Sequence, residues 1–269
     1  MKSMSFFDER KSDTLWPLGS ANLLEHISHH SSDGNLEKWR VDCSGFIYWL
    51  KSSSFSRTGE EMFECESECI ACRLAEQLGL DNVLYYDMGT LQKNTGDKIK
   101  VCYSKEFDED NIIYYDDAIP GVAQLVGEGK WDAVTEFNPS AVKSLQDLML
   151  FDILIGNTDR HLHNVAFDVE TGSFLLFDNG AGLCGSVPTN VLKNAIDISF
   201  NFHKCRPFYD TVGNQIKLIE TCTFNSVSQT WLKELVEEFL DKKRAKLITR
   251  YLVNNFRKVE DYFELSLLT

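Results

Sequence analysis

The chain of 269 residues is long enough to bury a sizeable core, and its 43% hydrophobic and 25% charged residues are typical of a globular protein. Its 27 basic and 41 acidic residues give a net charge of −14, which argues against direct binding of nucleic acid because the phosphate backbone would be repelled. No apolar stretch reaches the length of a membrane span, and the amino-terminal residues lack the apolar segment of a secretory signal, so we expect a cytoplasmic protein without a membrane span.

The first half of the chain predicts a small sheet and one helix. Residues 1–38 are polar and are expected to be irregular. Alternating apolar runs and helical spacing then predict a hairpin over 38–51 that turns at 42–45, a helix over 60–78 that ends at Gly79, and two strands over 83–89 and 98–103. The polar segment 52–59 is expected to be a flexible loop, and its serines are candidates for autophosphorylation.

The second half predicts mostly helices around one small hairpin. The acidic segment 104–117 is expected to be irregular and to separate the two halves. The pattern then predicts a helix over 141–155, a loop over 157–164, a hairpin with arms at 165–168 and 173–178, and a last long helix over 231–256. We therefore expect an N-lobe over residues 1–105 and a helical C-lobe over residues 106–269, packed as lobes of one unit.

The cysteines predict no metal centre. Cys65, Cys69 and Cys72 recur at the spacing of one helical face, but a zinc site would need a fourth ligand and usually a C-x-x-C knuckle. The histidines His26, His29 and His30 fit a solvated loop. Free and partly buried thiols are the expected state of the cysteines in a cytosolic chain.

Three polar residues gather in the stretch 151–180, at the ends of apolar runs. Asp159 precedes Asn164 by five residues, and Asp178 follows after the predicted hairpin. Phosphoryl transfer needs hard oxygen ligands for Mg²⁺, a carboxylate that orients the acceptor hydroxyl and a lysine for the nucleotide phosphates. This order and spacing match those of protein kinases, with Lys51 at the end of an upstream strand as the lysine.

The same residues resemble a known family. Residues 157–164, NTDRHLHN, resemble the T-D-x-H-x-x-N segment of HipA-like bacterial kinases and the D-R-H-x-x-N segment of phosphatidylinositol 3- and 4-kinases. Residues 177–180, FDNG, lie where those families carry a metal-binding aspartate. Upstream, residues 46–51 are similar to the strand that carries the lysine, residues 68–79 to the helix that carries its glutamate partner, and residues 101–107 to the hinge strand that meets adenine.

The resemblance implies an α+β, bilobal protein-kinase-like fold, with a small antiparallel-sheet N-lobe that includes one helix and a mainly helical C-lobe. It also implies a role for each site residue: Asp159 as catalytic base, Lys51 on the phosphates, Glu68 as partner of Lys51, Asn164 and Asp178 as Mg²⁺ ligands, backbone groups near Tyr103 and Lys105 at adenine, and His161 as a support of the catalytic loop. No G-x-G-x-x-G is present, so the phosphate lid is assigned either to Ser31–Asn35 or to Asp42–Gly45, with a contribution from 52–59.

The expected function is ATP- and Mg²⁺-dependent transfer of a phosphoryl group to serine or threonine of a protein acceptor. For a HipA-like kinase this includes the role of a toxin with an antitoxin partner. Two alternatives stay open: a lipid or small-molecule kinase with the same centre, and a nucleotide-binding pseudokinase that acts as a partner protein. A helical domain in which Asp159, Asn164 and Asp178 only form turns and caps is the non-functional interpretation.

Overall fold

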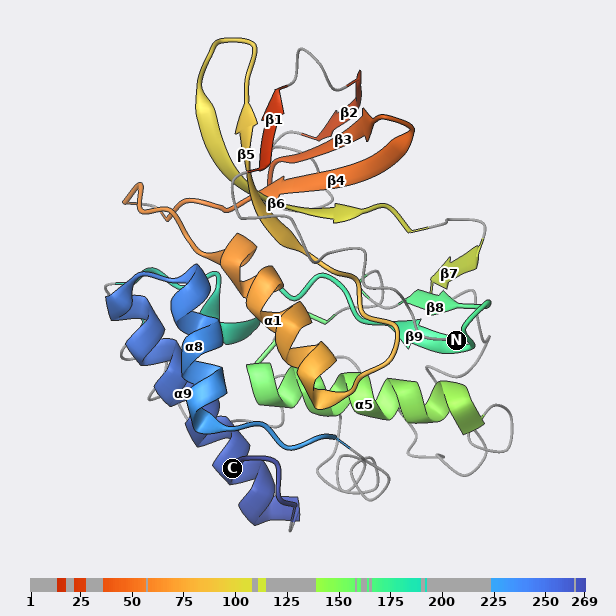
Figure 1. Cartoon of the computed structure of the whole chain (residues 1–269), viewed down its shortest axis with the longest axis vertical. Helices are drawn as coiled ribbons and strands as arrows, with labels where there is room; N and C mark the ends of the chain where they lie inside the picture. The colour runs from red at the N-terminus through yellow and green to blue at the C-terminus, as the bar shows by residue number, and fades with distance from the viewer. Residues whose placement is uncertain are drawn as a thin grey trace.

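A computed structural model describes residues 14–17, 22–27, 36–56, 58–107, 111–114, 139–157, 159–160, 164, 166–189, 192, 224–263 and 265–269. A sheet lies above a group of helices, with one helix, α1, running between them (Figure 1). No helix among these residues is both long and apolar enough to cross a membrane.

The upper sheet has six strands in the order β1-β5-β6-β4-β3-β2, and every neighbouring pair is antiparallel except β1 and β5. The strands are β1 (Thr14–Pro17), β2 (Asn22–Ile27), β3 (Lys38–Cys43), β4 (Phe46–Ser52), β5 (Asp87–Gln92) and β6 (Lys98–Lys105). The predicted hairpin over 38–51 is confirmed, and its turn uses the positive φ angles of Ser44 and Gly45. The expectation that residues 1–38 are irregular was wrong for β1 and β2.

Chain connectivity shows that this sheet is strongly curved. β1 and β2 lie at opposite edges, five strand spacings apart, or about 24 Å in a flat sheet. Only residues 18–21 join them, and five Cα steps span at most about 19 Å. The sheet therefore curls around a core of its own, made of Trp39, Val41, Leu50, Leu91, Val101 and Tyr103.

Helix α1 (Glu64–Leu78) begins four residues later than predicted, because residues 60–62 bond back to the segment after β4 and the N–H of Phe63 donates to the carbonyl of Gly185. Its end was predicted correctly: Gly79 is left-handed, its N–H bonds to Glu76 and the next N–H bonds to Ala75. The loop over 52–59 is less free than expected, since Ser53 Oγ accepts from the backbone N–H of Cys65 and Ser54 bonds to Glu64.

The strand predicted over 83–89 is displaced to β5. Val83 forms a parallel bridge with Leu176, and the N–H of Leu84 donates to the carbonyl of Leu176. These residues are thus held by the lower half of the molecule, and pairing with β6 starts only at Asp87.

The lower half holds a three-stranded sheet and the remaining helices: β7 (Ile112–Tyr114), α5 (Pro139–Ile155), β8 (Ala166–Asp168), β9 (Ser173–Leu175), the 3₁₀ helix η3 (Gly182–Cys184), α8 (Gln229–Phe239) and α9 (Lys242–Phe263). β7 lies in the acidic segment that was expected to be irregular. The single helix predicted over 231–256 is two helices, because Leu240 is extended and the Asp241 carboxylate accepts from the N–H groups of Lys243 and Arg244.

The largest core joins α1 to the lower helices. Ile70, Leu74 and Leu78 of α1 are buried in one cluster with apolar residues of α5, α8 and α9. The chain therefore has the expected α+β architecture with two lobes, and the helix between the lobes is anchored to the lower one.

Candidate active site

Lys51 lies between two carboxylates that come from distant parts of the chain. Strand β4 carries the lysine, and its ammonium group donates to Glu68 Oε1 at 3.1 Å, to Asp178 Oδ1 at 3.0 Å and to the hydroxyl of Tyr86 at 3.4 Å. Glu68 projects from α1 and Asp178 follows β9. The fold thus brings together three residues that were predicted as a set.

Glu68 is fixed at both oxygens. Its second oxygen accepts from the backbone N–H of Asn179 at 2.7 Å, so the α1 carboxylate is bonded to the residue after Asp178 as well as to Lys51. The side chain is almost fully buried. Glu68 therefore couples the position of α1 to the segment that carries Asp178.

The cluster of Lys51, Glu68 and Asp178 contains one cation and two carboxylates. Burial acts to lower the pKa of Lys51, but Asp178 and Glu68 outweigh it and hold that pKa well above its usual value. Burial raises the pKa of Glu68, and the Lys51 charge only partly opposes this. Burial acts in the same direction on Asp178, but Lys51, Lys38 and Arg160 keep its pKa well below the usual range.

Asp178 has an unusual backbone conformation for its residue type. Its φ angle is +54°, in the left-handed region that non-glycine residues rarely adopt, and such strain is concentrated at functional sites. Its side chain remains 26% exposed, compared with 9% for Lys51 and 2% for Glu68. Asp178 is thus the member of the cluster that faces solvent.

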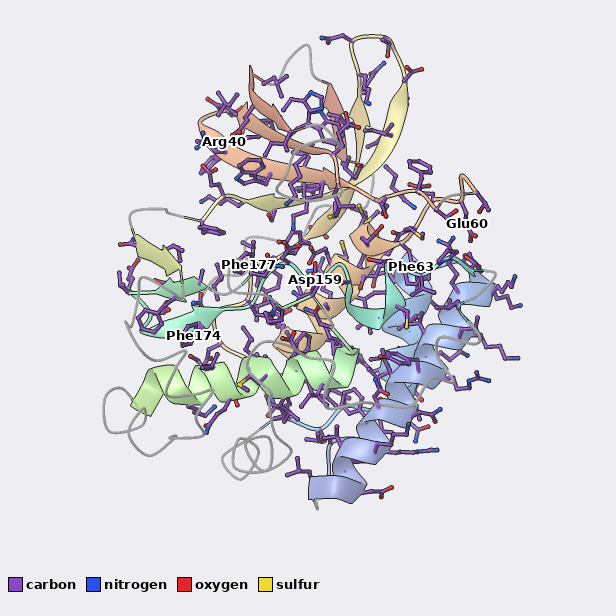
Figure 2. All side chains as sticks on the ribbon, turned by 180° about the vertical axis from the view of Figure 1, so that it is seen from behind. Arg40, Glu60, Phe63, Asp159, Phe174 and Phe177 are labelled. Carbon is purple, nitrogen blue, oxygen red and sulfur yellow. The ribbon has the colours of Figure 1, made fainter. Side chains whose placement is uncertain are left out.

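The end of α5 sets the course of the loop that carries Asp159. Gly156 has a φ of +65°, its N–H bonds to Ile153, and the next N–H bonds to Asp152, which is a Schellman motif. Asn157 then accepts from the N–H of Asp159 at 3.0 Å. The Asp159 side chain is exposed, in the region between the upper sheet and α5 (Figure 2).

Asn164 is tied to the same loop. Its side-chain Nδ2 donates to the carbonyl of Asp159 at 3.0 Å, and the residue is buried. The amide oxygen of Asn164 is left for another partner, because the structure gives it no bond among the described residues. His161 lies outside the described residues, so its predicted role stays a prediction.

Arg160 is a fully buried residue to which the sequence analysis assigned no role. Its Nε and Nη2 bind both oxygens of Asp152, at 2.9 and 3.0 Å. Nη1 donates to the carbonyls of Asn164 and Phe177, and Nη2 also donates to Asn179 Oδ1 at 2.6 Å. All five N–H groups are used. Arg160 therefore connects the end of α5, the loop and the segment around Asp178.

Tyr103 and Lys105 lie on β6, the strand beside Lys51. Tyr103 pairs with Leu50 on one side and with Asp87, the first residue of β5, on the other. The edge of β6 that pairs with β5 has no partner strand after Tyr103 among the described residues. The backbone of Ser104 and Lys105 is therefore open along that edge. The Lys105 side chain lies over the ring of Phe46, 5.0 Å from its centroid, and so it is the backbone that fits the predicted role.

Strand register excludes one of the two predicted phosphate lids. Lys51 pairs with Lys38 and Lys38 with Ile27, so the connection between β2 and β3 starts beside Lys51. The turn Asp42–Gly45 is at the opposite end of the hairpin, where Cys43 pairs with Phe46. The candidate Ser31–Asn35 belongs to the β2–β3 connection but lies outside the described residues.

A group of buried thiols lies behind Lys51. Cys65, Cys69, Cys72 and Cys102 pack with Tyr86, and all four are free. Burial raises the pKa of Cys72 to about 12 and that of Cys69 well above its usual value, so both stay protonated at neutral pH. These thiols form packing around the lysine.

Four residues of the centre were missed by the sequence analysis: Tyr86, Asp152, Arg160 and Asn179. Arg160 stands directly after Asp159, and an arginine inside an otherwise apolar, buried stretch could have indicated a paired charge. Asp152 within the apolar helix α5 gives the complementary signal. Tyr86 and Asn179 show no pattern that distinguishes them.

Comparison with known proteins gives the fold. No protein-family model and no curated protein sequence matches the chain. The crystal structure of the Helicobacter pylori proinflammatory kinase CtkA is similar to it with a TM-score of 0.61 and 16% sequence identity, covering 93% of this chain and 99% of that one. Hydra Fam20 with sugar has a TM-score of 0.48 at 13% identity, covering 92% of this chain and 87% of its own. The Golgi casein kinase has a TM-score of 0.47 at 14% identity, covering 91% and 72%. The chain thus has a protein-kinase-like fold.

Proposed function

We propose that this chain is a kinase that uses ATP and Mg²⁺ to phosphorylate serine or threonine of a protein acceptor. The observation that carries the proposal is Lys51 Nζ, held at 3.1 Å from Glu68 and 3.0 Å from Asp178. A lysine fixed by a helix glutamate beside a metal-binding aspartate is the arrangement that protein kinases require. The similar CtkA structure is also named as a kinase.

The residues present fit a divalent cation. Two carboxylates bond to one lysine, and Asp178 is exposed enough to take a further ligand. Asp178 and the amide oxygen of Asn164 would hold Mg²⁺ through hard oxygen ligands. When bound, the metal neutralises negative charge on the nucleotide phosphates.

The remaining groups are assigned by position. Lys51, steadied by Glu68, would bind the phosphates, and the open backbone edge of β6 near Tyr103 and Lys105 would meet adenine. Asp159 is exposed between the lobes and would accept the proton of the acceptor hydroxyl.

The test is transfer of radiolabelled phosphate from Mg-ATP by the full chain, compared with Asp159→Asn and Asp178→Asn. We expect labelling to fall by at least about a hundredfold in each variant, the usual effect of losing a catalytic or charge-stabilising group. Glu170→Gln, on the exposed hairpin turn before Asp178, is the matched control and should label like the wild type. Equal labelling by all four proteins would overturn the proposal.

Offering different acceptors in the same assay distinguishes a protein kinase from a lipid kinase and from a pseudokinase. We expect acid-stable phosphoserine or phosphothreonine on protein and no label on phosphoinositide vesicles, because a net charge of −14 is unfavourable near anionic lipid. Label on the vesicles alone would make the chain a lipid kinase. Thermal stabilisation by Mg-ATP without turnover would make it a pseudokinase.

The resemblance of residues 157–164 to HipA-like kinases extends the proposal to a toxin role. Induced expression in a bacterial host should then arrest growth, and co-expression of the neighbouring reading frame should relieve the arrest if it encodes the antitoxin. Asp178→Asn should grow normally. Growth arrest by both forms would remove phosphoryl transfer as its cause.

A further inference from the structure

The outer face of helix α9 carries a row of basic residues. The helix lies along the outside of the lower half (Figure 1), and its apolar residues, such as Ile248 and Leu252, pack inward in the largest core. The segment 242–259 contains seven basic residues and no acidic one, in a chain with 41 acidic and 27 basic residues. Arg244 binds Glu60. The other six are exposed and are called here the basic stripe: Lys242, Lys243, Lys246, Arg250, Arg257 and Lys258.

Helical spacing places the basic stripe on one side of α9. Residues three or four positions apart lie on the same face of a helix, and Lys242, Lys246 and Arg250 follow one another at four-residue steps. At a rise of about 1.5 Å per residue, the stripe runs for about 24 Å from Lys242 to Lys258. The exposed residue between its two halves, Asn254, is uncharged. The stripe is therefore a continuous positive surface on an acidic protein.

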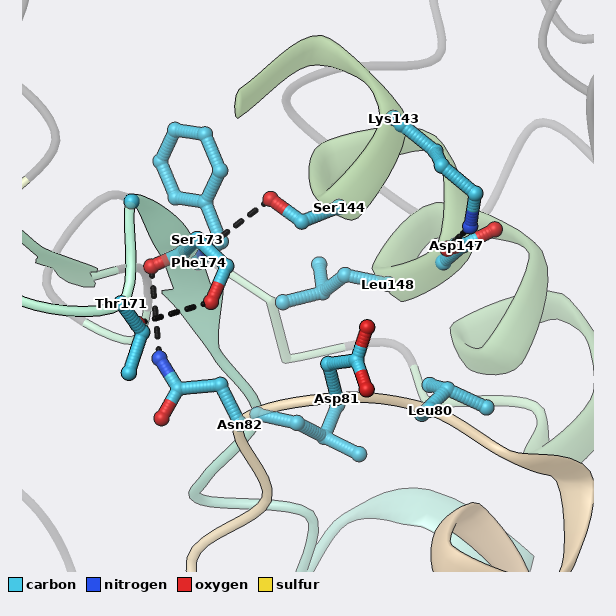
Figure 3. A pocket seen from close by; sticks show the side chains of 12 residues that line it. Leu80, Asp81, Asn82, Lys143, Ser144, Asp147, Leu148, Thr171, Ser173 and Phe174 are labelled. Carbon is cyan, nitrogen blue, oxygen red and sulfur yellow. Dashed lines mark hydrogen bonds and ion pairs between the residues drawn. The ribbon is translucent and has the colours of Figure 1, made fainter. Parts of the chain in front are cut away.

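Most of the basic stripe lacks the acidic partners that lysines on other helices have. Lys143 of α5 bonds to Asp147, one turn further along the same helix, as Figure 3 shows. Lys233 of α8 lies 3.8 Å from Glu237, again one turn away. Within the part of the chain that the structure describes, four members of the stripe have no ion pair: Lys242, Lys243, Lys246 and Arg257.

The charges of the basic stripe disfavour the helix that carries them. Lys242 and Lys243 lie in the first turn of α9, at the positive end of the helix dipole, and no acidic residue shares that turn. Lys246 is four residues from both Lys242 and Arg250, and like charges at that spacing repel. A surface that served only the fold would mix both signs, as the exposed face of α8 does. A bound anionic partner would relieve both effects.

We propose that the basic stripe is a docking surface for an acidic segment of a partner protein. In an extended peptide, the side chains on one face recur about every 6.6 Å, close to the rise of about 6 Å between residues four apart on a helix. Carboxylates on alternate residues of a segment about seven residues long would therefore meet successive cations of the stripe. Each meeting is a charge-assisted hydrogen bond.

The structure favours an acidic peptide over the other common polyanions. The net charge of −14 repels a nucleic acid, whose phosphates would extend beyond the stripe. Insertion into a membrane interface needs a free apolar helix face, but the apolar face of α9 is buried in the core. A short acidic segment meets neither obstacle. The stripe shares no residue with the centre around Lys51, so the inference stands apart from the proposed kinase function.

The experiment is a fluorescence anisotropy titration of the full chain with a labelled seven-residue peptide of alternating glutamate and serine. We expect saturable binding that weakens as salt is added, and no binding of the same peptide with glutamine in place of glutamate. The double variant Lys243→Glu with Lys246→Glu should bind about tenfold more weakly or worse, because two attractive contacts become repulsive. Lys98→Glu with Lys233→Glu makes the same change in net charge at exposed positions outside the stripe, and should bind within about twofold of the wild type.

Urea unfolding of the same proteins separates loss of docking from loss of folding. Lys243→Glu with Lys246→Glu should unfold at a higher urea concentration than the wild type, because it removes repulsion and places an acid near the positive end of the helix dipole. A lower midpoint would show that these cations serve the fold and would overturn the inference.

Three binding results would also overturn it: no binding of the peptide by the wild type, equal weakening in the two double variants, or tighter binding of duplex DNA or phosphatidylserine vesicles than of the peptide. Peptide binding and phosphate labelling are independent measurements. Loss of peptide binding leaves the kinase proposal intact, and failure of labelling leaves the docking surface intact.

Discussion

Two buried ion clusters among the described residues differ in charge balance. The lysine cluster is Lys51 with Glu68, Asp178 and Tyr86, and the arginine cluster is Arg160 with Asp152, Asn157 and Asn179. The arginine cluster pairs one cation with one carboxylate, and its other acceptors are neutral. The lysine cluster sets one cation against two carboxylates and keeps one edge exposed, at Asp178.

This difference indicates a structural role for the arginine cluster and a ligand-binding role for the lysine cluster. A balanced and fully bonded ion pair has no capacity for a ligand, and its disruption leaves an uncompensated buried charge. An unbalanced cluster with an exposed carboxylate can accept a further cation. The two are joined, because Asn179 donates its N–H to Glu68 and its side-chain oxygen accepts from Arg160. The arginine cluster thus holds the frame in which the lysine cluster can exchange partners.

The largest expected effect is on activity, in Asp178→Ala. Labelling should fall about a thousandfold, because the proposed metal ligand and the partner of Lys51 are lost together. The unfolding free energy should change by less than about 1 kcal/mol, since Lys51 keeps Glu68 as a balanced partner and the removed charge was partly exposed. Labelling rates and urea unfolding of the same preparation measure both. A stability loss above 3 kcal/mol would place Asp178 in the framework instead.

Arg160→Met should give the largest loss of stability, about 3–5 kcal/mol by urea unfolding, because Asp152 is left charged and fully buried. The second change Asp152→Leu should restore part of the loss by removing that charge. Arg73→Met, which breaks a partly exposed ion pair with Asp87, is the control and should cost less than about 1 kcal/mol. Equal losses for Arg160→Met and Arg73→Met would refute the distinction between the clusters.

Lys51→Met should change how stability depends on pH. Without the lysine, Glu68 is a buried carboxylate beside Asp178, so its pKa, already raised by burial, rises further. A carboxyl group whose pKa is higher in the folded protein than its unfolded value of about 4.3 destabilises the fold at pH values above about 4.3. At such pH values the group must either take up a proton or bury its charge when the chain folds. The unfolding free energy of the variant should therefore increase as the pH falls from 8 toward 5, relative to the wild type.

Matched unfolding curves at several pH values test this, and Lys100→Met supplies the control. Lys100 also pairs with a buried glutamate, Glu66, but lies at a more exposed position. Its loss should produce a weaker pH dependence. Parallel pH profiles for the wild type and Lys51→Met would show that Lys51 does not control the charge of Glu68.

Part of the candidate site could be proposed from the sequence because several of its residues lie close together in the chain. Asp159, Asn164 and Asp178 stand at ordered spacings after apolar runs, and Lys51 ends a clear hairpin strand. The contact of Lys51 with Glu68 and Asp178 joins residues 17 and 127 positions apart, and only the resemblance to a kinase family connected them in advance.

What the sequence did not predict depends on tertiary packing. β1 and β2 have only four and six residues, and β1 pairs with β5, more than 70 positions away, so the local pattern did not reveal them. The segment 83–86 has strand composition but bonds to Leu176, which moved the start of β5 to Asp87. The helical spacing of apolar residues continues through Leu240, so the sequence predicted one helix. The cap at Asp241 divides it into two. Arg160 remained unassigned because its five acceptors come from four separate residues.

The smallest expected effect concerns Tyr86, the most distant of the three acceptors of Lys51 at 3.4 Å. Tyr86→Phe removes the hydroxyl but keeps the ring, whose centroid is 5.1 Å from the ammonium group. The loss of stability should be below about 1 kcal/mol, because a hydrogen bond as long as this one contributes little, and labelling should stay within about threefold of the wild type. Tyr86→Leu, which also removes the ring, should cost more.

Urea unfolding of both variants decides whether Lys51 is held by charge or by its full set of contacts. If the carboxylates hold it, the hydroxyl is dispensable and the lysine remains able to turn from Asp178 toward an incoming phosphate. A loss for Tyr86→Phe as large as that for Lys51→Met would mean that all three bonds are needed, as in the arginine cluster. Lys51 would then be a fixed framework residue that could not turn toward a ligand. Any ligand binding would have to come from the charge imbalance of the lysine cluster alone.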